Sequence, residues 1–444
     1  MAIFVEDATE LPVDMDRPAV AYPSAGVRYY TLLIVICANT LSTLDRQIMN
    51  ILVEPIRKEL GLSDSQMGFL TGVAFALVYV ACCIPAARLA DRWPRKYVMG
   101  AAIGIWSAMT ILCGFARNSV QLFFARFGVG FGEAGGMAPA QALLGDIFPR
   151  HQRATVMAIT LISAPLGGWL GLTIGGMAAQ NWGWREAFML AGIPGLILAP
   201  LVLFTLPNVR KGAADNARAE LKPDPFWHTI KGLVRQKSYP LMIAAATLQT
   251  VTASGIQTWV PAFVQRSHGL DLKAVGAGLG AAVFLGSLIG HLAGGPVMDW
   301  VGKRDLRWHF WLPAITALLS GGFTAIGLIS PIGFVFIAMG LQIFFSALFG
   351  GPMAAITMNL SSATSRATAL ACIYVVINLF ALGLGPWLLG LLSDLLKPEF
   401  GAESLRWALL IATLSSLPAS FLFYRASVTY RADIAAVDAR NRAA

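Results

Sequence analysis

The chain has 444 residues, of which 56% are hydrophobic and 13% are charged, and its formal net charge is +9. Soluble domains carry about 25% charged residues, so this composition excludes an ordinary soluble domain and indicates a membrane protein. The positive charge is typical of proteins with nucleic-acid or acidic partners. Its distribution along the chain follows membrane topology instead, as the loops show.

Twelve apolar stretches are each long enough to cross a bilayer, for which a helix needs about 20 residues. They lie at residues 28–54, 65–89, 98–116, 118–148, 153–178, 186–206, 240–265, 274–298, 308–329, 331–358, 367–393 and 405–424. We therefore predict an all-α membrane protein with twelve transmembrane helices in two pseudo-symmetric six-helix bundles. The bundles cover residues 28–206 and 240–426.

Three polar segments complete the predicted organisation. Residues 1–27 form a cytoplasmic N-terminal segment, residues 207–239 a cytoplasmic linker and residues 427–444 a cytoplasmic tail. In the linker, Asp224 and Pro225 resemble the start of a helix, and the apolar residues that follow repeat with amphipathic spacing. This helix lies either on the membrane surface or against the bundle as an ordinary connector, and the sequence favours neither.

The basic residues indicate how the chain is oriented. If both termini are cytoplasmic, 23 of the 33 Lys and Arg residues lie on the cytoplasmic side, eight lie outside, and two (Arg46 and Arg126) lie within the membrane. This asymmetry is the positive-inside rule. It predicts a multi-pass protein of the cell membrane, inner or plasma, and argues against nucleic-acid binding.

Four ionisable residues stand deep in the first and fourth predicted helices: Asp45, Arg46, Arg126 and Glu133. Each costs at least about 2.5–3.5 kcal/mol at the centre of a membrane helix on insertion scales, so function is their default explanation. Arg126 and Glu133 are seven residues apart and therefore share one helix face, with Gly130 leaving space between them.

The two charges of the first helix point in different directions. Arg46 shares a polar stripe with Asn39 and Ser42, so we expect it to face the central cavity. Asp45 lies among apolar residues, so we expect it to turn toward a neighbouring helix and toward Arg126.

We predict that Glu133 binds the coupling proton and that Asp45, Arg126 and Arg46 take part in the coupling. Burial disfavours the charged form of a carboxyl group and a nearby arginine favours it, so a movable arginine makes proton affinity depend on conformation. The alternative is that the four charges form buried ion pairs that hold the first and fourth helices together, although such pairs are weak evidence for stability.

A repeat links the two bundles. The stretch ARLADRWPRK at 87–96 recurs in degenerate form as GPVMDWVGKR at 295–304, and Gly68, Gly72 and Asp91 map onto Gly276, Gly280 and Asp299, each by 208 residues. Two homologous halves in a polytopic membrane protein indicate alternating-access transport. The two aspartates stand where they could pair with loop arginines or with the positive N-terminus of a helix.

The second half has no acidic residue deep in a helix, and its candidate substrate contacts are neutral. They are Trp259, Phe263, Phe284, Phe344, Tyr374 and Asn378. Each aromatic side chain could equally pack within the bundle or contact lipid. A charged first half beside an apolar second half suits an amphiphilic substrate. Metal-spaced His/Cys clusters, nucleophile motifs and phosphate-binding loops are missing from the sequence, so we expect no enzyme, cofactor or metal site.

With these features the chain resembles the major facilitator superfamily, whose signature between helices 2 and 3 is similar to residues 87–96, although Ala87 and Pro94 stand where the family usually or often has Gly. It resembles more specifically the spinster-like branch of lysophospholipid and sphingosine-phosphate transporters. The supporting stretches are Leu44-Asp45-Arg46, Arg126 to Ala134, Trp259 to Phe263, Arg266 and Gly383 to Asp394.

The resemblance implies two roles for these residues. The first is proton coupling through the charges of helices 1 and 4. The second is a conformational latch that joins the halves while the site faces outward, formed by Asp91, Arg95, Asp299, Arg153 and Arg366.

We predict a proton-coupled secondary transporter of an amphiphilic lipid, a lysophospholipid or sphingoid phosphate, whose anionic head Arg46 and Arg126 would bind. One alternative is a transporter of a small organic acid, aromatic or sugar, bound by the same arginines. A second alternative is a membrane sensor without transport. The expected partners are the substrate, protons and membrane lipids, and a monomer suffices.

Overall fold

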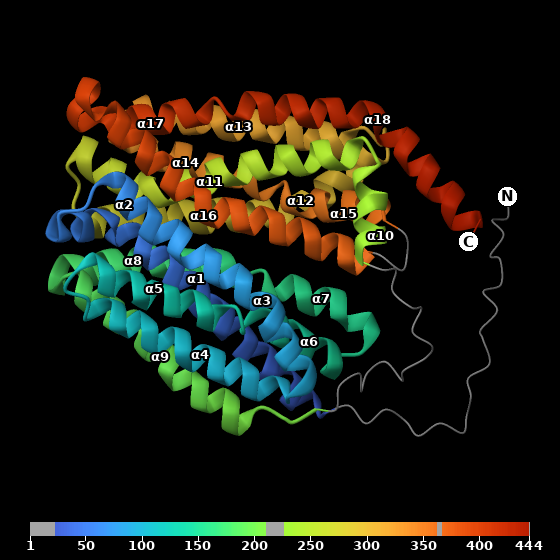
Figure 1. The fold of residues 1–444 in the computed structure, drawn as a ribbon, viewed down its shortest axis with the longest axis horizontal. Helices are drawn as coiled ribbons and strands as arrows, with labels where there is room; N and C mark the ends of the chain where they lie inside the picture. Colours follow the sequence, from blue (N-terminus) through green and yellow to red (C-terminus); the bar gives the residue numbers. More distant parts are fainter. Residues whose placement is uncertain (1–22, 210–225, 362–365, 444) are drawn as a thin grey trace.

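The computed structural model describes residues 23–209, 226–361 and 366–443, and throughout these ranges the regular elements are helices (Figure 1). The helices of the first half are α1 (Ala25–Leu60), α2 (Asp64–Gly68), the π-helical turn η1 (Phe69–Val73), α3 (Ala74–Arg92), α4 (Arg95–Gly114), α5 (Ser119–Glu133), α6 (Met137–Ile147), α7 (Arg150–Thr160), α8 (Ser163–Trp182) and α9 (Trp184–Thr205).

The linker helix and the second half follow. They comprise α10 (Phe226–Val234), α11 (Ser238–His268), α12 (Leu272–Gly302), α13 (Trp308–Ile329), α14 (Ile332–Ala347), α15 (Gly350–Asn359), α16 (Arg366–Phe400), the 3₁₀ turn η3 (Gly401–Glu403), α17 (Ser404–Thr413) and α18 (Ser416–Ala443). The predicted segments 1–22 and 210–225, including Asp224 and Pro225, lie outside the described residues.

Each of the twelve predicted apolar stretches coincides with one helix or with consecutive helices, and the predicted all-α membrane fold is confirmed. In the described ranges, eight helical stretches are long and apolar enough to cross a membrane. The remaining stretches are shorter or interrupted. The fourth breaks at residues 134–136, directly after Glu133, where Gly135 and Gly136 weaken helix continuity.

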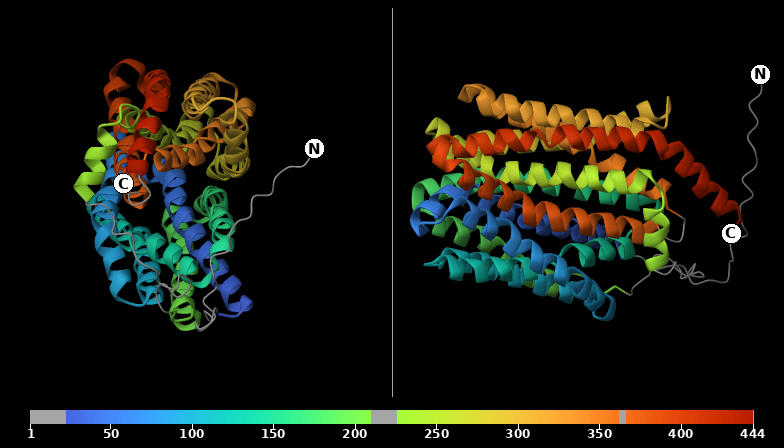
Figure 2. Two further views of the ribbon diagram at one scale, coloured as in Figure 1. Left: turned by 90° about the vertical axis from the view of Figure 1, so that its right-hand side faces the viewer. Right: turned by 45° about the horizontal axis from the view of Figure 1, so that its top comes forward.

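The two halves lie side by side with their helices roughly parallel to the long axis (Figures 1 and 2). We call the end that holds the α1–α2 turn the distal end, at the left of Figure 1, and the end that holds α10 the proximal end. The halves pack mainly through α2–η1–α3 against α16 and through α8 against α12, and α1 also contacts α11.

The repeated glycines are the points where these pairs touch. A Cβ atom on Gly68 would meet the backbone of Pro386, and one on Gly276 would meet the carbonyl oxygen of Leu172. Because only glycine permits such an approach of two helix backbones, the 208-residue repeat marks equivalent contacts between the halves.

The distal turns repeat as well. Gly61 and Gly269 end α1 and α11 in the left-handed conformation, with φ of 63° and 66°, and Ser63 and Asp271 then cap the next helix. Glycine is favoured at such a helix end because it adopts positive φ without steric cost. The two halves therefore share local geometry as well as topology.

The linker helix α10 contacts the second half. Leu233 is 3% exposed and belongs to an apolar cluster with Tyr239 and Ile356. Just beyond the helix, the buried Gln236 side chain donates to the carbonyl oxygen of Leu360 at 2.8 Å. Both contacts tie the linker to the bundle.

Candidate functional site

Glu133 lies at the end of α5 and is ion-paired with the first helix. Arg46 donates from Nε to Glu133 Oε2 at 2.7 Å, and its Nη2 lies 2.6 Å from the same oxygen. Ser42, one turn earlier on α1, donates to that oxygen at 3.1 Å. The Glu133 side chain is fully buried, whereas Arg46 is 30% exposed. One carboxylate oxygen therefore accepts all three contacts.

Asp45 and Arg126 form the other half of the charge cluster. Asp45 accepts a 2.6 Å hydrogen bond from Thr110 on α4. Arg126, only 2% exposed, lies near enough for its charge to act on Asp45. Within the described chain, Arg126 Nε and Nη1, Glu133 Oε1 and Asp45 Oδ1 are buried without a hydrogen-bond partner. Native structures rarely leave buried polar atoms unpaired, so this cluster is poised for binding chemistry.

Aromatic rings cover both arginines. The Phe75 ring on α3 lies 5.4 Å from the guanidinium of Arg46 and 5.5 Å from that of Arg126. Tyr79 stacks on Phe75 at 5.5 Å and lies 5.6 Å from Arg46. Such rings attract cations while excluding water, which holds the guanidiniums in place without neutralising them.

Arg46, Arg126 and Glu133 line a cavity of about 430 Å³ between the halves, together with the predicted residues Asn39 and Ser42. A second cavity of about 460 Å³ lies in the second half. The two share six lining residues: Ser254, Gln257, Val283, Ser287, Ile343 and Leu382. The two cavities therefore adjoin each other, and the Asp, Glu, Lys and Arg side chains line only the first.

The structure brings one of the predicted second-half residues to this space: Asn378 lines the second cavity. Trp259 and Phe263 are fully buried, and Trp259 donates from Nε1 to the Pro386 carbonyl at 2.8 Å near the distal end. Phe284 packs against Trp169, and Phe344 against Phe345. The Tyr374 side chain lies outside the described residues.

The residues predicted to form a latch lie toward the proximal end. Arg95 forms an ion pair with Asp146 and donates to the carbonyl oxygen of Ala142 at 2.8 Å, both in its own half. Arg153 Nε donates to the Phe148 carbonyl at 3.2 Å. Asp91 and Asp299 are both exposed, and the Arg366 side chain lies outside the described residues.

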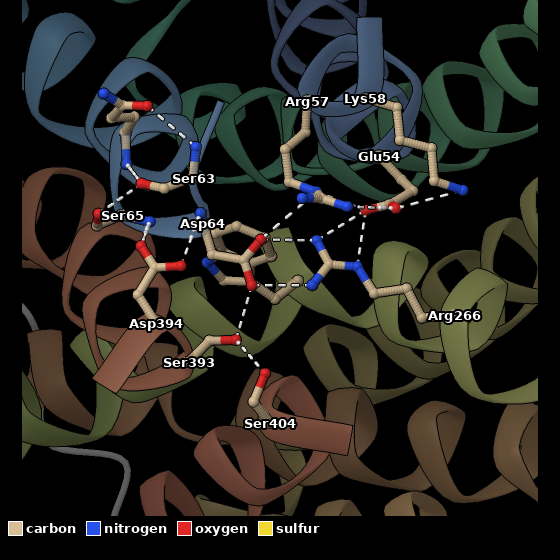
Figure 3. Close-up of polar contacts among 12 residues, drawn as sticks. Glu54, Arg57, Lys58, Ser63, Asp64, Ser65, Arg266, Ser393, Asp394 and Ser404 are labelled. Carbon is tan, nitrogen blue, oxygen red and sulfur yellow. Dashed lines mark hydrogen bonds and ion pairs between the residues drawn. The ribbon is translucent and has the colours of Figure 1, made fainter. Parts of the chain in front are cut away.

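A second charge cluster, which the sequence interpretation missed, joins the halves at the distal end (Figure 3). We call it the distal gate: Glu54, Arg57, Asp64, Arg266, Ser393 and Asp394. Arg266 on α11 donates to Glu54 at 2.7 Å and to both oxygens of Asp64 at 2.7 and 2.8 Å. Arg57 bridges the same two carboxylates, and Ser393 donates to Asp64 at 2.7 Å.

The distal gate also contains a helix cap supplied by the other half. Asp394 on α16 accepts from the backbone N–H groups of Asp64 and Ser65 at 3.1 and 2.7 Å (Figure 3). At the equivalent position of the repeat, the Gln180 side chain on α8 accepts from the backbone N–H of Leu272 at 3.2 Å. The first turn of a helix has unpaired N–H groups, so each half completes a helix of the other.

One local signal pointed to this gate. Ser63 and Gln66 form a capping box, with hydrogen bonds of 3.2 and 3.0 Å, whose sequence pattern marks a helix start after Gly61. Nothing local pairs α2 with Arg266, because the partners are 202 residues apart. In the described chain, clusters of His, Cys, Asp or Glu that could hold a metal ion are absent.

Two helical halves with a charged cavity between them indicate that this protein belongs to the class of membrane transporters. The model of the Major Facilitator Superfamily matches residues 35–320. The chain is 31% identical over 425 residues to an MFS-type efflux pump of Mycolicibacterium smegmatis, covering 95% of this chain and 96% of that protein. The protein therefore belongs to the major facilitator superfamily, and it is a transporter family member rather than an enzyme, as predicted.

The spinster-like resemblance is also confirmed. The chain is 26% identical to the sphingosine-1-phosphate transporter SPNS2 of Mus musculus over 421 residues, 89% of this chain and 76% of that one. Its fold matches the crystal structure of a bacterial homologue of the human lysosomal transporter Spinster, in an inward-facing and unoccupied conformation. The TM-score is 0.86 at 24% identity, covering 93% of this chain and 99% of that one.

Proposed function

We propose that the protein transports an amphiphilic lipid with an anionic head, a lysophospholipid or sphingoid phosphate, and that protons drive the transport. The observation that carries the proposal is the pair of adjoining cavities, of which only one is lined by charged side chains. Arg46, Arg126 and Glu133 line the first cavity, and the lining of the second contains no Asp, Glu, Lys or Arg among the described residues. The name of the mouse relative supports a lipid phosphate.

The coupling follows from the Arg46–Glu133 pair. Protonation of Glu133 would remove the negative charge that holds Arg46, so that Arg46 and Arg126 together could bind a phosphate. Proton and anion would then move in the same direction. A choline-like cation that competes with the proton for Glu133 would favour exchange instead.

Alternating access requires that one end closes while the other opens. We propose that the distal end is extracellular, that both termini are cytoplasmic, and that the distal gate closes the outside in this structure. In the opposite state the gate would separate, and Asp91 and Asp299 would latch the proximal end with Arg95, Arg153 and Arg366.

The second candidate is transport of a small organic acid. Amide side chains also line the first cavity, on three different helices, and amides suit a polyhydroxylated acid such as a sugar acid. They are Asn39, Gln47, Asn50, Gln141 and Gln257. The remaining alternative, a sensor without transport, requires that flux be absent altogether.

The test is flux of labelled lysophospholipid into proteoliposomes under an imposed pH gradient, comparing the wild type with Glu133→Gln. We expect flux that follows the proton gradient and falls at least about 100-fold in the variant, because Gln cannot cycle between charged and neutral forms. Glu399→Gln, an exposed glutamate at the distal end, is the matched control.

Each contrary result identifies another function. Flux that ignores both pH and Glu133 describes a facilitator in which the ion pair is structural. Sugar-acid flux without lysolipid flux favours the second candidate. The absence of flux for both substrates, in protein shown to be folded, favours a sensor.

A further inference from the structure

Phe75 of α3 packs against α5 at Gly130, which lies between the two charges of that helix. A Cβ atom on Gly130 would meet the Phe75 carbonyl oxygen at 2.7 Å and its Cδ2 at 3.4 Å, so α3 touches α5 at this glycine. Gly130 follows Arg126 by four residues and precedes Glu133 by three, on one helix face. The gap that the glycine leaves is therefore filled by the backbone carbonyl group of Phe75, and the edge of the Phe75 ring lies beside it.

The charges near this contact are paired between helices and not within α5. Glu133 is ion-paired with Arg46 of another helix, although Arg126 lies two turns away on its own helix. Within the described residues, Glu133 Oε1 and Arg126 Nε and Nη1 are each left without a partner. Two opposite buried charges, each with polar atoms that lack a hydrogen-bond partner, would attract each other strongly in this low-dielectric space. Phe75 is the residue that contacts α5 between these two charges.

We infer that Phe75 is a positioning residue that keeps Arg126 out of the Glu133 ion pair and thereby holds Arg126 available for the anionic head of the substrate. The ring contributes in two ways. Its volume blocks the direct path between the two side chains, and its face stabilises the guanidinium of Arg126 at 5.5 Å without neutralising it. The inference rests on the proposed function, which requires a cation that remains available to the anionic head of the substrate.

Several other charged groups surround Glu133, and one of them, Asp45, interacts with the charge of Arg126. The titratable and charged side chains of this region are Asp45 and Arg46 on α1, Tyr79 and Cys83 on α3, Cys113 on α4 and Arg126 on α5. Tyr79 contacts Arg46, and Phe75 alone among the described aromatic residues contacts both arginines. Removal of its ring would leave Arg126 as the nearest free cation for the unpaired oxygen of Glu133.

The experiment compares Phe75→Ala, which opens the gap, with Phe75→Leu, which fills it without an aromatic face. Phe127→Ala is the matched control, since Phe127 is 43% exposed on α5 and its ring packs against Phe123. The first readout is an infrared titration of the Glu133 carboxyl band, assigned with Glu133→Gln, which needs no substrate. The second is the Kd of a lysophospholipid with a phosphate head.

In Phe75→Ala we expect the titration midpoint to fall by about one pH unit, because a carboxylate paired with two guanidiniums takes up a proton only at lower pH. The Kd should rise about tenfold, because Arg126 is engaged. In Phe75→Leu the midpoint should stay in place and the Kd should rise about threefold, through loss of the cation–π contact. Phe127→Ala should match the wild type in both.

A wild-type midpoint and Kd in Phe75→Ala overturn the inference, as does an equal midpoint shift in Phe127→Ala. If Phe75→Ala does not fold, a wild-type Kd in Phe75→Leu overturns it. A wild-type protein that binds no lysophospholipid refutes the proposed substrate instead. The infrared titration still decides the role of Phe75 in that case.

Discussion

Two groups of buried charges each include residues of α1, and they are paired in different ways. At the distal gate, every carboxylate oxygen of Glu54 and Asp64 accepts a hydrogen bond, and Arg266 donates from all three of its nitrogens. In the central cluster, one oxygen of Glu133 carries three contacts while its other oxygen has none in the described chain. Arg46 and Glu54 are eight positions apart on one helix.

This difference in hydrogen bonding separates a structural ion-pair network, at the distal gate, from a cluster that can bind a ligand, at the centre. A buried ion pair whose hydrogen bonds are all made resists separation, because removing one partner leaves an uncompensated charge. Buried charges with unpaired atoms retain the capacity to take up a proton or an anion. Charged residues of the same types therefore hold the two halves together at the distal end and remain available to bind a proton or an anion at the centre.

The largest expected effect is loss of the free cation at the centre. Arg126→Gln should lower lysophospholipid flux about 100-fold, since it removes an anion-binding charge and leaves Asp45 buried without its nearby cation. Flux in proteoliposomes measures the loss, and Arg117→Gln, an exposed arginine in the α4–α5 loop, is the control. Retention of more than a third of wild-type flux contradicts a role for Arg126 in substrate binding.

Breaking the distal gate should shift the conformation. Arg266→Gln leaves Glu54 and Asp64 without their shared partner from the other half, at a cost of about 3–5 kcal/mol. The distal ends should therefore separate, which spin labels at residues 117 and 399 report as a longer distance. An unchanged distance distribution, with unchanged melting temperature, refutes the gate.

The two helix caps that one half supplies to the other, Asp394 and Gln180, should differ in how strongly they stabilise closure, because only Asp394 is charged. Asp394→Ala should weaken closure by about 1 kcal/mol, a roughly fivefold population shift, because a carboxylate caps two N–H groups. Gln180→Ala removes a neutral cap on one N–H group and should shift the same spin-label distance less. An equal or reversed ranking means that helix packing, rather than capping charge, closes the distal end.

The smallest effect is expected for an exposed pair near the proximal end. Asp305 lies 2.7 Å from Arg431, whose side chain is 54% exposed, and such pairs contribute little. The backbone N–H of Arg307, and then Arg431, hold the pKa of Asp305 below its ordinary value. Because the folded pKa is lowered, any stabilisation is present above about pH 4 and is lost as the pH falls further.

Arg431→Gln should accordingly leave transport and the melting temperature at pH 7 unchanged. Melting curves at pH 7 and pH 4, in low and high salt, measure this. A clear drop in the melting temperature of the variant at pH 7 would place this pair with the distal gate rather than with ordinary surface charges.

Much of the architecture followed from local patterns. Apolar length predicted twelve spans because each helix must satisfy its own backbone in the bilayer, and each span coincides with helices of the structure. The 208-residue repeat predicted two equivalent halves, and its glycines are the contacts between them. The polar stripe on α1 predicted that Arg46 lines the cavity, since side-chain direction along a helix follows from residue spacing.

The pairing of charges could not be predicted in this way. The sequence placed Arg126 and Glu133 on one helix face, with space at Gly130. Only the packing of α3 shows that Phe75 lies in that space, and only the packing of α1 shows that Glu133 pairs with Arg46. Glu54, Asp64 and Arg266 likewise meet only because two halves about 200 residues apart in sequence close at one end. Spacing along a helix determines which face a side chain occupies. Its partner depends on how the helices are packed around that face, which is a property of the tertiary structure.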